Sequence, residues 1–403
     1  MWRHLFGADH RVLVPGTDSS GQAEQWPRAL GPRPNPAVFD WLPGSSGIPW
    51  LADGPALASL AQAGADTEAP APSAVNAVHD KGFAAQIARV EGYEPKCLRD
   101  LSATYSPQDL ADPGPWLHGL AQHLAQWPDW IGGAFTLKPR MGSSGRGRVS
   151  GLAQALEADR IRAALPRLAQ RGGAVLEPWL TRETDLSVML HIASPGDEAK
   201  ARGKDRSKAQ PPITLLGAGE QRIAPSGVYL GHLGEIDSRG RVFSGGPWEE
   251  NMREAAVAVA TRAREAGYWG PCGIDGFSFR GPRQQGEEPR ATAPVRLRPI
   301  VEFNARFTVG IVAVGLIRRA LASIKTELGL EPGERRGFLF ALDPPPGWAH
   351  WRALADAAGP GALLIPLAGE PGDEKEPAQP ALLFARDAAT LRAALSAAPG
   401  APD

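Results

Sequence analysis

The C-terminal half of the chain carries two carboxylates and a carboxamide in a pattern that suits a metal site. Glu302, Asn304 and Arg306 alternate along an apolar run, and Asp275 lies 27 residues before Glu302 in a second such run. Alternate residues of a strand share a face, so neighbouring antiparallel strands would bring the carboxylates together. Carboxylate and amide oxygens are ligands for Mg²⁺. The alternative is a solvated polar face, but apolar neighbours such as Phe303 favour a central strand, where buried acids need a cation.

A second motif joins a strand-borne lysine to a loop rich in glycine and serine. Lys138 ends an apolar run, and the loop that follows contains Gly142, Ser143, Ser144, Gly145 and Gly147. Glycines allow backbone N–H groups to turn inward around an anion, and the lysine can neutralise a phosphate. The order differs from the Walker A motif, in which the lysine follows the glycines. Taken alone, such a loop is more often an ordinary turn, so both interpretations stay open.

The third motif places an acid beside an aromatic residue between two expected strands. It consists of Glu177, Pro178, Trp179 and Leu180, followed by Asp185 eight residues after the glutamate. An adenosine could bind here, with its base on apolar side chains and its hydroxyl groups on a carboxylate. The alternative is a strand end with a core tryptophan, and it is the better interpretation of this segment on its own.

These motifs require strands that lie next to one another, and the hydrophobic pattern predicts them. Apolar runs predict strands over 134–138, 174–180, 186–192, 274–280 and 295–304. Helical spacing predicts helices over 80–92, 152–168, 249–266 and 310–328. The last part of the chain predicts strands over 338–342, 362–366 and 381–385, with helices over 349–358 and 388–397. The fold class is therefore mixed α+β with antiparallel sheets.

Together the motifs are more specific than any one of them. In order, the chain has Lys81 after an aspartate, Lys138 with its glycine loop, the Glu177 segment, Asp275, and the E-x-N-x-R element that begins at Glu302. This resembles the ATP-grasp superfamily, and the motif order is similar to that of biotin carboxylase and D-alanine–D-alanine ligase. The resemblance covers 75–328. It implies two α+β lobes that grip ATP between antiparallel sheets.

The resemblance also implies roles for the nucleotide-binding residues. Lys81 and Lys138 would be two phosphate-contacting lysines, and the loop 142–147 would close over the β- and γ-phosphates. The segment 177–180 would be the adenine hinge. Because Pro178 has no N–H, it would offer only its carbonyl, and Leu180 would be the donor. Asp185 stands where relatives often have a polar residue that contacts the ribose or the phosphates.

The implied reaction is that of a carboxylate–amine ligase. Asp275, Glu302 and Asn304 would hold Mg²⁺, with two ions expected and Mn²⁺ as a substitute, and Arg306 would face the reacting carboxylate. ATP would phosphorylate this carboxylate, and an amine or thiol would then displace phosphate from the acyl phosphate. Such relatives are commonly dimers, so a homodimer is expected.

Two other functions are compatible with the same motifs. Some relatives phosphorylate an alcohol or a similar group and form no amide, so a small-molecule kinase is the first alternative. The second is a nucleotide-binding regulatory protein without turnover. The complete set of lysines, metal ligands and arginine argues against the second, because a degenerate member should lose its metal ligands first.

Composition narrows the classes of partner. Lys and Arg number 43 against 44 Asp and Glu, a net charge of −1 that argues against nucleic-acid binding. The two cysteines, Cys97 and Cys272, cannot form a disulfide framework. No uncharged apolar run reaches the length of a membrane span, and the first residues lack the apolar core of a signal peptide. A soluble cytoplasmic protein is therefore expected.

The chain is predicted to divide into four parts. Residues 1–74 would form an irregular leading domain, and 75–175 the N-terminal lobe with the phosphate loop. Residues 176–328 would form the C-terminal lobe with the metal site. The remainder, 329–403, would be a small α/β subdomain.

Overall fold

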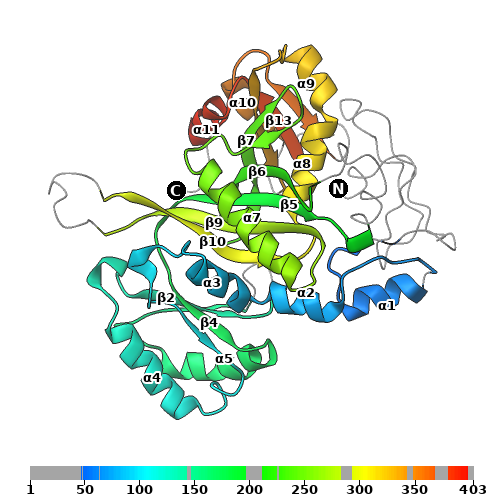
Figure 1. Cartoon of the computed structure of the whole chain (residues 1–403). Coiled ribbons are helices and arrows are strands. Elements are labelled where there is room, and N and C mark those ends of the chain that lie inside the picture. The colour runs from blue at the N-terminus through cyan, green and yellow to red at the C-terminus, as the bar shows by residue number, and fades with distance from the viewer. Residues whose placement is uncertain are drawn as a thin grey trace.

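The computed structural model describes residues 47, 49–62, 64–142, 147–196, 211–224, 227–282, 293–342, 348–367 and 380–397. Within them the chain forms two antiparallel sheets, of four and nine strands, and helices pack against both (Figure 1). The prediction of an α+β fold with two lobes and antiparallel sheets is confirmed. Most of the predicted leading domain lies outside the described residues, as do parts of the charged segments 194–210 and 281–293.

The smaller lobe is built on a sheet with the strand order β1-β4-β2-β3. Its strands are β1 (Ala103–Tyr105), β2 (Ala134–Pro139), β3 (Val149–Leu152) and β4 (Ala174–Pro178). Two helices, α4 (Pro113–Ala125) and α5 (Ala158–Gln170), share its apolar core. Helix α5 contributes Ile161, Leu165 and Leu168, whose spacing places them on one face of the helix. This core fixes β2, and with it Lys138.

The larger sheet has the strand order β10-β9-β5-β6-β7-β11-β13-β12, with β8 beside β7. Its strands are β5 (Arg182–Ile192), β6 (Ile213–Ile223), β7 (Tyr229–Asp237), β8 (Val242–Phe243), β9 (Gly270–Arg280), β10 (Val295–Asn304), β11 (Arg335–Ala341), β12 (Leu363–Pro366) and β13 (Ala381–Ala385). Among the described residues all of its strand pairings are antiparallel, including β5 with β9 and β9 with β10. The strands that carry the predicted metal ligands are therefore neighbours.

Helices cover both faces of the larger sheet, and strand alternation assigns each face. Val188 of β5 packs into the cluster that contains α7 (Glu249–Glu265), α2 (Pro72–His79) and α3 (Lys81–Val90). The next residue, Met189, belongs to the cluster of α8 (Val309–Arg319) and α9 (Leu321–Glu327). Successive side chains of a strand point to opposite faces. The α8 face of the central strands therefore also carries the odd-numbered residues of β5 that precede Met189.

Side-chain caps define the starts of two helices that border the site. Asp80 precedes α3 and accepts a hydrogen bond from the Gly82 N–H, 2.7 Å away. Thr308 precedes α8 and accepts one from the Ile311 N–H at 3.3 Å. An aspartate or threonine at this position satisfies a backbone donor that the first turn of a helix leaves unpaired. These caps place Lys81 and the segment after Asn304 at the beginning of their helices.

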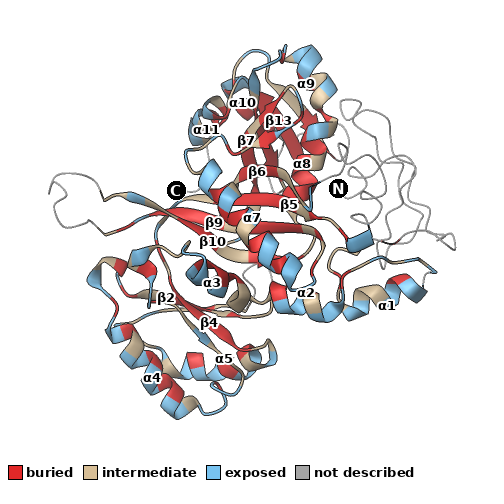
Figure 2. Cartoon of the chain, viewed as in Figure 1, coloured by how far each residue is buried: buried red, intermediate tan, exposed pale blue. Residues whose placement is uncertain are grey.

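The remaining helices lie at the ends of the chain's described part. Helix α1 (Gly54–Gln62) precedes α2, and α10 (Trp348–Ala357) and α11 (Ala388–Ala397) share an apolar cluster with β7, β11 and β13. Figure 2 shows that the central strands of the larger sheet are mostly buried, whereas the outer sides of the helices are exposed. Among the described residues, no helix combines the length and the apolarity that a membrane crossing needs.

Several boundaries differ from the predicted ones. The limit placed between residues 175 and 176 falls inside β4, a strand of the smaller sheet. Helix α3 packs on β10 of the larger sheet, so Lys81 belongs to that side of the molecule. The predicted C-terminal subdomain supplies β11, β12 and β13 to the same sheet. Strand pairing, which a local pattern cannot show, unites these segments.

Two predicted helices also differ in extent. The helix expected over 152–168 begins only at Ala158, because 149–152 pair with β2 as strand β3. The helix expected over 310–328 is divided at Ala320 into α8 and α9. The strand 295–304 has the predicted bounds, and so do the strand 381–385 and the helix 388–397.

Candidate functional site

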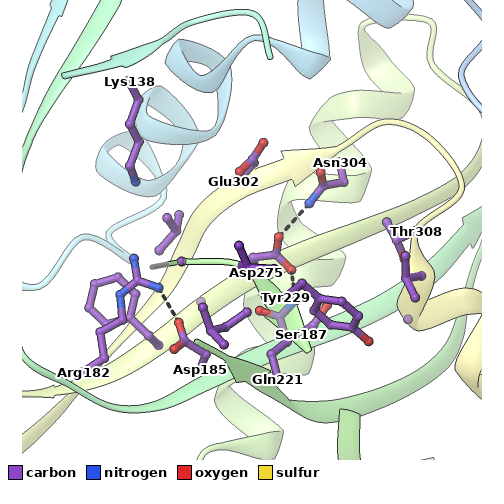
Figure 3. Close-up of a pocket in the computed structure, with 18 of the residues that line it drawn as sticks. Lys138, Arg182, Asp185, Ser187, Gln221, Tyr229, Asp275, Glu302, Asn304 and Thr308 are labelled. Atoms are coloured by element: carbon purple, nitrogen blue, oxygen red, sulfur yellow. Dashed lines mark hydrogen bonds and ion pairs between the residues drawn. The ribbon is translucent and has the colours of Figure 1, made fainter. Parts of the chain in front are cut away.

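A cleft of about 1120 Å³ is lined by residues of both lobes. Its lining includes Lys138 from β2 of the smaller sheet and Asp185, Asp275 and Glu302 from the larger sheet. In Figure 3, Lys138 extends from above toward the acidic side chains on the strands below it. The cleft therefore brings basic and acidic groups from distant parts of the sequence to one place.

A row of polar side chains crosses three neighbouring strands at the floor of the cleft. Ser187 of β5 is in register with Asp275 of β9, which is in register with Glu302 of β10. Residues directly opposite one another in an antiparallel pair share a face. The pairing of β9 with β10 is irregular between Arg298 and Glu302. The structure places the carboxylates of Asp275 and Glu302 on adjacent antiparallel strands, as the sequence predicts.

Neutral donors surround the carboxylate of Asp275. Gln221 donates through Nε2 to one oxygen at 2.9 Å, and Asn304 donates through Nδ2 to the other at 2.8 Å (Figure 3). The pKa of Asp275 is raised to about 6, mainly by burial and then by the neighbouring charge of Glu302; hydrogen bonds from Ser187 and Asn304 oppose the shift. Asp275 is thus a half-buried acid that, among the described residues, forms no ion pair with a cation.

Lys81 neutralises the second carboxylate. Its Nζ lies 3.0 Å from Glu302 Oε1 and donates to the Gly142 carbonyl at 2.6 Å. Burial alone would raise the pKa of Glu302, but the charge and the hydrogen bond of Lys81, together with the charge of Lys138, outweigh burial and lower the pKa. Lys81 therefore connects the acidic centre to the first residue of the glycine loop.

The oxygen donors at this centre fit Mg²⁺. The carboxylates of Asp275 and Glu302 and the carboxamide oxygen of Asn304 are hard ligands. In the part of the chain that the structure describes, no three histidine, cysteine or acidic side chains group together as a metal site. The amide oxygen would therefore complete the set. Asn304 Oδ1 now accepts a hydrogen bond from Arg306 at 2.9 Å, and the buried Arg306 Nε has no partner among the described residues.

Lys138 is paired with a buried acid. Its Nζ contacts Glu177 Oε2, and Arg298 Nη2 lies 2.5 Å from the other oxygen, Glu177 Oε1. Burial by itself would raise the pKa of Glu177, but the charges of Arg298 and Lys138 outweigh burial and lower the pKa to about 2. Burial also lowers the pKa of Lys138, against the charge of Glu177. Glu177 is an ion-paired side chain beneath the cleft wall.

Trp179 and two arginines form the wall at the β4–β5 connection. The guanidinium of Arg148 lies 4.6 Å from the Trp179 ring centroid, and that of Arg182 lies 5.2 Å from it. Arg182 also pairs with Asp185 at 2.5 Å. Cations favour such positions over aromatic faces. The tryptophan is therefore a cleft residue, contrary to the core position that the segment alone favoured.

The predicted site residues fall into three groups. Those that line the cleft are Lys81, Lys138, Gly142, Trp179, Leu180, Asp185, Asp275, Glu302, Asn304 and Arg306. Those that the structure describes but that are not among the lining residues are Gly147, Glu177 and Pro178. Those that lie outside the described residues are Ser143, Ser144 and Gly145.

Sequence reasoning missed several lining residues. They include Arg148, Arg182, Ser187, Gln221, Tyr229, His232 and Thr308. A signal existed for Ser187, because it lies on the strand predicted over 186–192 and two positions after Asp185, so that alternation places both on one face. Gln221 and His232 lie on β6 and β7 in register with each other. No local sequence pattern shows that these two strands pair with each other, so no sequence signal identified the two residues.

Comparisons with known proteins return solved structures only. The chain resembles N5-carboxyaminoimidazole synthase from Aspergillus clavatus, in complex with ADP and 5-aminoimidazole ribonucleotide, at 15% identity and TM-score 0.46, over 87% of this chain and 78% of that one. It also resembles biotin carboxylase from Campylobacter jejuni at 14% identity and TM-score 0.48, over 87% and 73% of the two chains. No family model matches the sequence, and no curated protein does.

Proposed function

We propose that the chain is an ATP-dependent ligase of the ATP-grasp superfamily. It would activate a substrate carboxylate as an acyl phosphate for attack by an amine or thiol. The observation that carries the proposal is the register of Asp275 with Glu302 on adjacent strands, with Asn304 beside them and two lysines directed at the same cleft. This combination supplies oxygen ligands for a metal and cations for phosphates within one cleft.

ATP would lie along the cleft between the two sheets. Its phosphates would contact Lys138 and Lys81, beside Gly142 at the edge of the cleft. The base would lie near Trp179 and Leu180, and Leu180 would be the hinge donor. The Trp179 N–H cannot serve in this way, because it donates to the Ala134 carbonyl at 2.8 Å.

Asp275, Glu302 and Asn304 would hold Mg²⁺, which supplies charge neutralisation to the transferring phosphoryl group when bound. The raised pKa of Asp275 supports this assignment, because a buried carboxylate without a cation is costly. Two ions are proposed, as is tolerance of Mn²⁺. The chain's own contribution is to orient these oxygens through Gln221 and Ser187.

Arg306 would bind the reacting carboxylate. Its Nε is buried and has no partner among the described residues, so a substrate oxygen would satisfy it. A carboxylate oxygen would attack the γ-phosphorus and release ADP, and the amine nitrogen would then attack the acyl carbon. Phosphate would leave with the bonding electrons, and the amine would lose a proton. Arg306 would stabilise the charge on the tetrahedral intermediate.

The proposal is tested by calorimetric titration with an ATP analogue, with and without Mg²⁺, on the natural protein and on Asp275→Asn. We expect magnesium-dependent binding that the substitution removes. Pools of carboxylates and amines are then screened for ADP release. Release that requires an amine supports the ligase, whereas release with a hydroxyl acceptor alone supports the kinase. No nucleotide binding under any condition would contradict both.

A further inference from the structure

Three charged side chains form a buried cluster at the junction of the lobes. Glu177 lies between Lys138 and Arg298 and contacts one of them through each carboxylate oxygen. The side chains of Glu177 and Arg298 are 5% and 7% exposed, and that of Lys138 is 18% exposed. The cluster has two positive charges and one negative charge. One cation is therefore in excess of what the carboxylate needs.

The two cations differ in their access to the cleft. Of the three residues, only Lys138 is among those that line it. Arg298 comes from β10 of the larger sheet, whereas Lys138 and Glu177 come from β2 and β4 of the smaller sheet. The Arg298 guanidinium lies 5.9 Å from the ring centroid of Phe277, its partner in register on β9. Arg298 is thus enclosed by its own sheet and by the other lobe.

This arrangement bears on how Lys138 can reach a phosphate. An ammonium group that is held by a carboxylate must leave it, at least in part, to bind a second anion. If Glu177 had no other partner, this movement would leave a buried carboxylate uncompensated, which is strongly unfavourable. Arg298 would prevent this, because its Nη2 lies 2.5 Å from Glu177 Oε1, the oxygen that Lys138 does not contact.

We propose that Arg298 is a positioning residue, the permanent counter-ion of Glu177 that releases Lys138 to the nucleotide phosphates. Arg298 itself would contact no nucleotide. The inference rests on the proposed function, because it assumes that the cleft binds a nucleotide. In this arrangement the excess positive charge of the cluster is available to the incoming anion. It also predicts that removal of Arg298 harms binding only while Glu177 keeps its charge.

The test is a double-mutant cycle read by calorimetric titration with ADP. Arg298→Met should raise the ADP Kd about tenfold, the effect of a coupling between neighbouring charges, because Glu177 then retains Lys138. Adding Glu177→Gln to this variant should bring the Kd back to within about threefold of the natural protein. A role of Arg298 that does not act through the charge of Glu177 would not be rescued by removal of that charge.

The exposed Arg280–Glu183 pair provides the matched control. It joins β9 and β5 of the larger sheet, with N···O 2.7 Å and side chains 45% and 31% exposed. Arg280→Met should leave the ADP Kd unchanged. Circular dichroism and thermal unfolding check the fold of each variant, and Arg298→Gln replaces Arg298→Met in the cycle if the methionine variant does not fold.

Two outcomes would overturn the inference alone. One is an unchanged ADP Kd in Arg298→Met. The other is a double variant that binds as weakly as Arg298→Met, which would mean that Arg298 contacts the nucleotide or merely holds the lobes together. Failure of the natural protein to bind ADP, with or without Mg²⁺, would overturn the proposed function and this inference together.

Discussion

Two acids of the cleft region, the buried Glu177 and the half-buried Asp275, have opposite electrostatic environments. Glu177 has a cation on each oxygen, and its pKa falls to about 2. Asp275 accepts hydrogen bonds from the amides of Gln221 and Asn304 and lies beside another acid, and its pKa rises to about 6. Burial opposes ionisation at both sites. The resident cations therefore decide the difference.

The comparison indicates which sign of charge each region could bind from a ligand. The cluster around Glu177 has a surplus cation, which suits an incoming phosphate. At the centre around Asp275, Lys81 contacts Glu302, whereas only the charge of Arg306, without an ion pair, acts on Asp275, which suits an incoming metal ion. A nucleotide with its metal carries both kinds of charge. The two regions would therefore be complementary to the phosphates and to the metal ion of the proposed nucleotide complex.

The largest expected effect is on turnover at the acidic centre. Glu302→Gln removes the charge of a proposed metal ligand and leaves Lys81 without its carboxylate, so we expect kcat to fall by about 100-fold or more. ADP release with the true substrates measures this effect. Circular dichroism should show an unchanged fold. Turnover at the natural rate would contradict the metal assignment of Glu302.

The second effect concerns affinity and not turnover alone. Lys138→Ala removes the cation that lines the cleft above the acids, so ATP-analogue binding should weaken about 10- to 100-fold, the value of a hydrogen bond to a charged group. Calorimetric titration gives the Kd. If affinity were unchanged while kcat fell, Lys138 would act only in the transition state. The cluster around Glu177 would then not be the region that binds the phosphates of the ground-state nucleotide.

The pH dependence of stability provides a third test. The pKa of Asp275 is about 6 in the folded protein and 3.8 is its ordinary value. The folded state therefore binds the extra proton between these values, and metal-free stability decreases as pH rises through this window. With a chelator present, the titration of this group should lower Tm by about 1–3 °C as pH rises through the window. Asp275→Asn should lose this contribution, and Mg²⁺ should raise Tm at pH 7.5 only in the natural protein.

The smallest effect is expected at Ser187, which sequence reasoning missed. Its hydrogen bond favours the ionised form of Asp275, so Ser187→Ala should weaken Mg²⁺-dependent nucleotide binding about fivefold, equivalent to about 1 kcal/mol. Titrations at two Mg²⁺ concentrations separate this effect from loss of nucleotide contact. Equal weakening without Mg²⁺ would show that Ser187 serves the nucleotide instead.

Much of the acidic centre could be predicted from the sequence because its signals are local. Alternation along β10 places Glu302 and Asn304 on one face, and the neighbouring apolar run that carries Asp275 forms β9 in register with it. Lys138 at the end of β2 is likewise a short-range pattern of strand and loop. Period-two alternation needs only a few consecutive residues, so it is visible without any tertiary contact.

The sequence by itself determined the fold class, the strands that carry the proposed metal ligands, and the lysines and acids that line the cleft. Only the tertiary structure decided that Arg298 shares Glu177 with Lys138, a contact across 121 residues of chain. It alone also joined β11–β13 to the sheet that carries the site. Such contacts depend on which strands pair and how the lobes meet, and nothing in the local pattern of either partner encodes that choice.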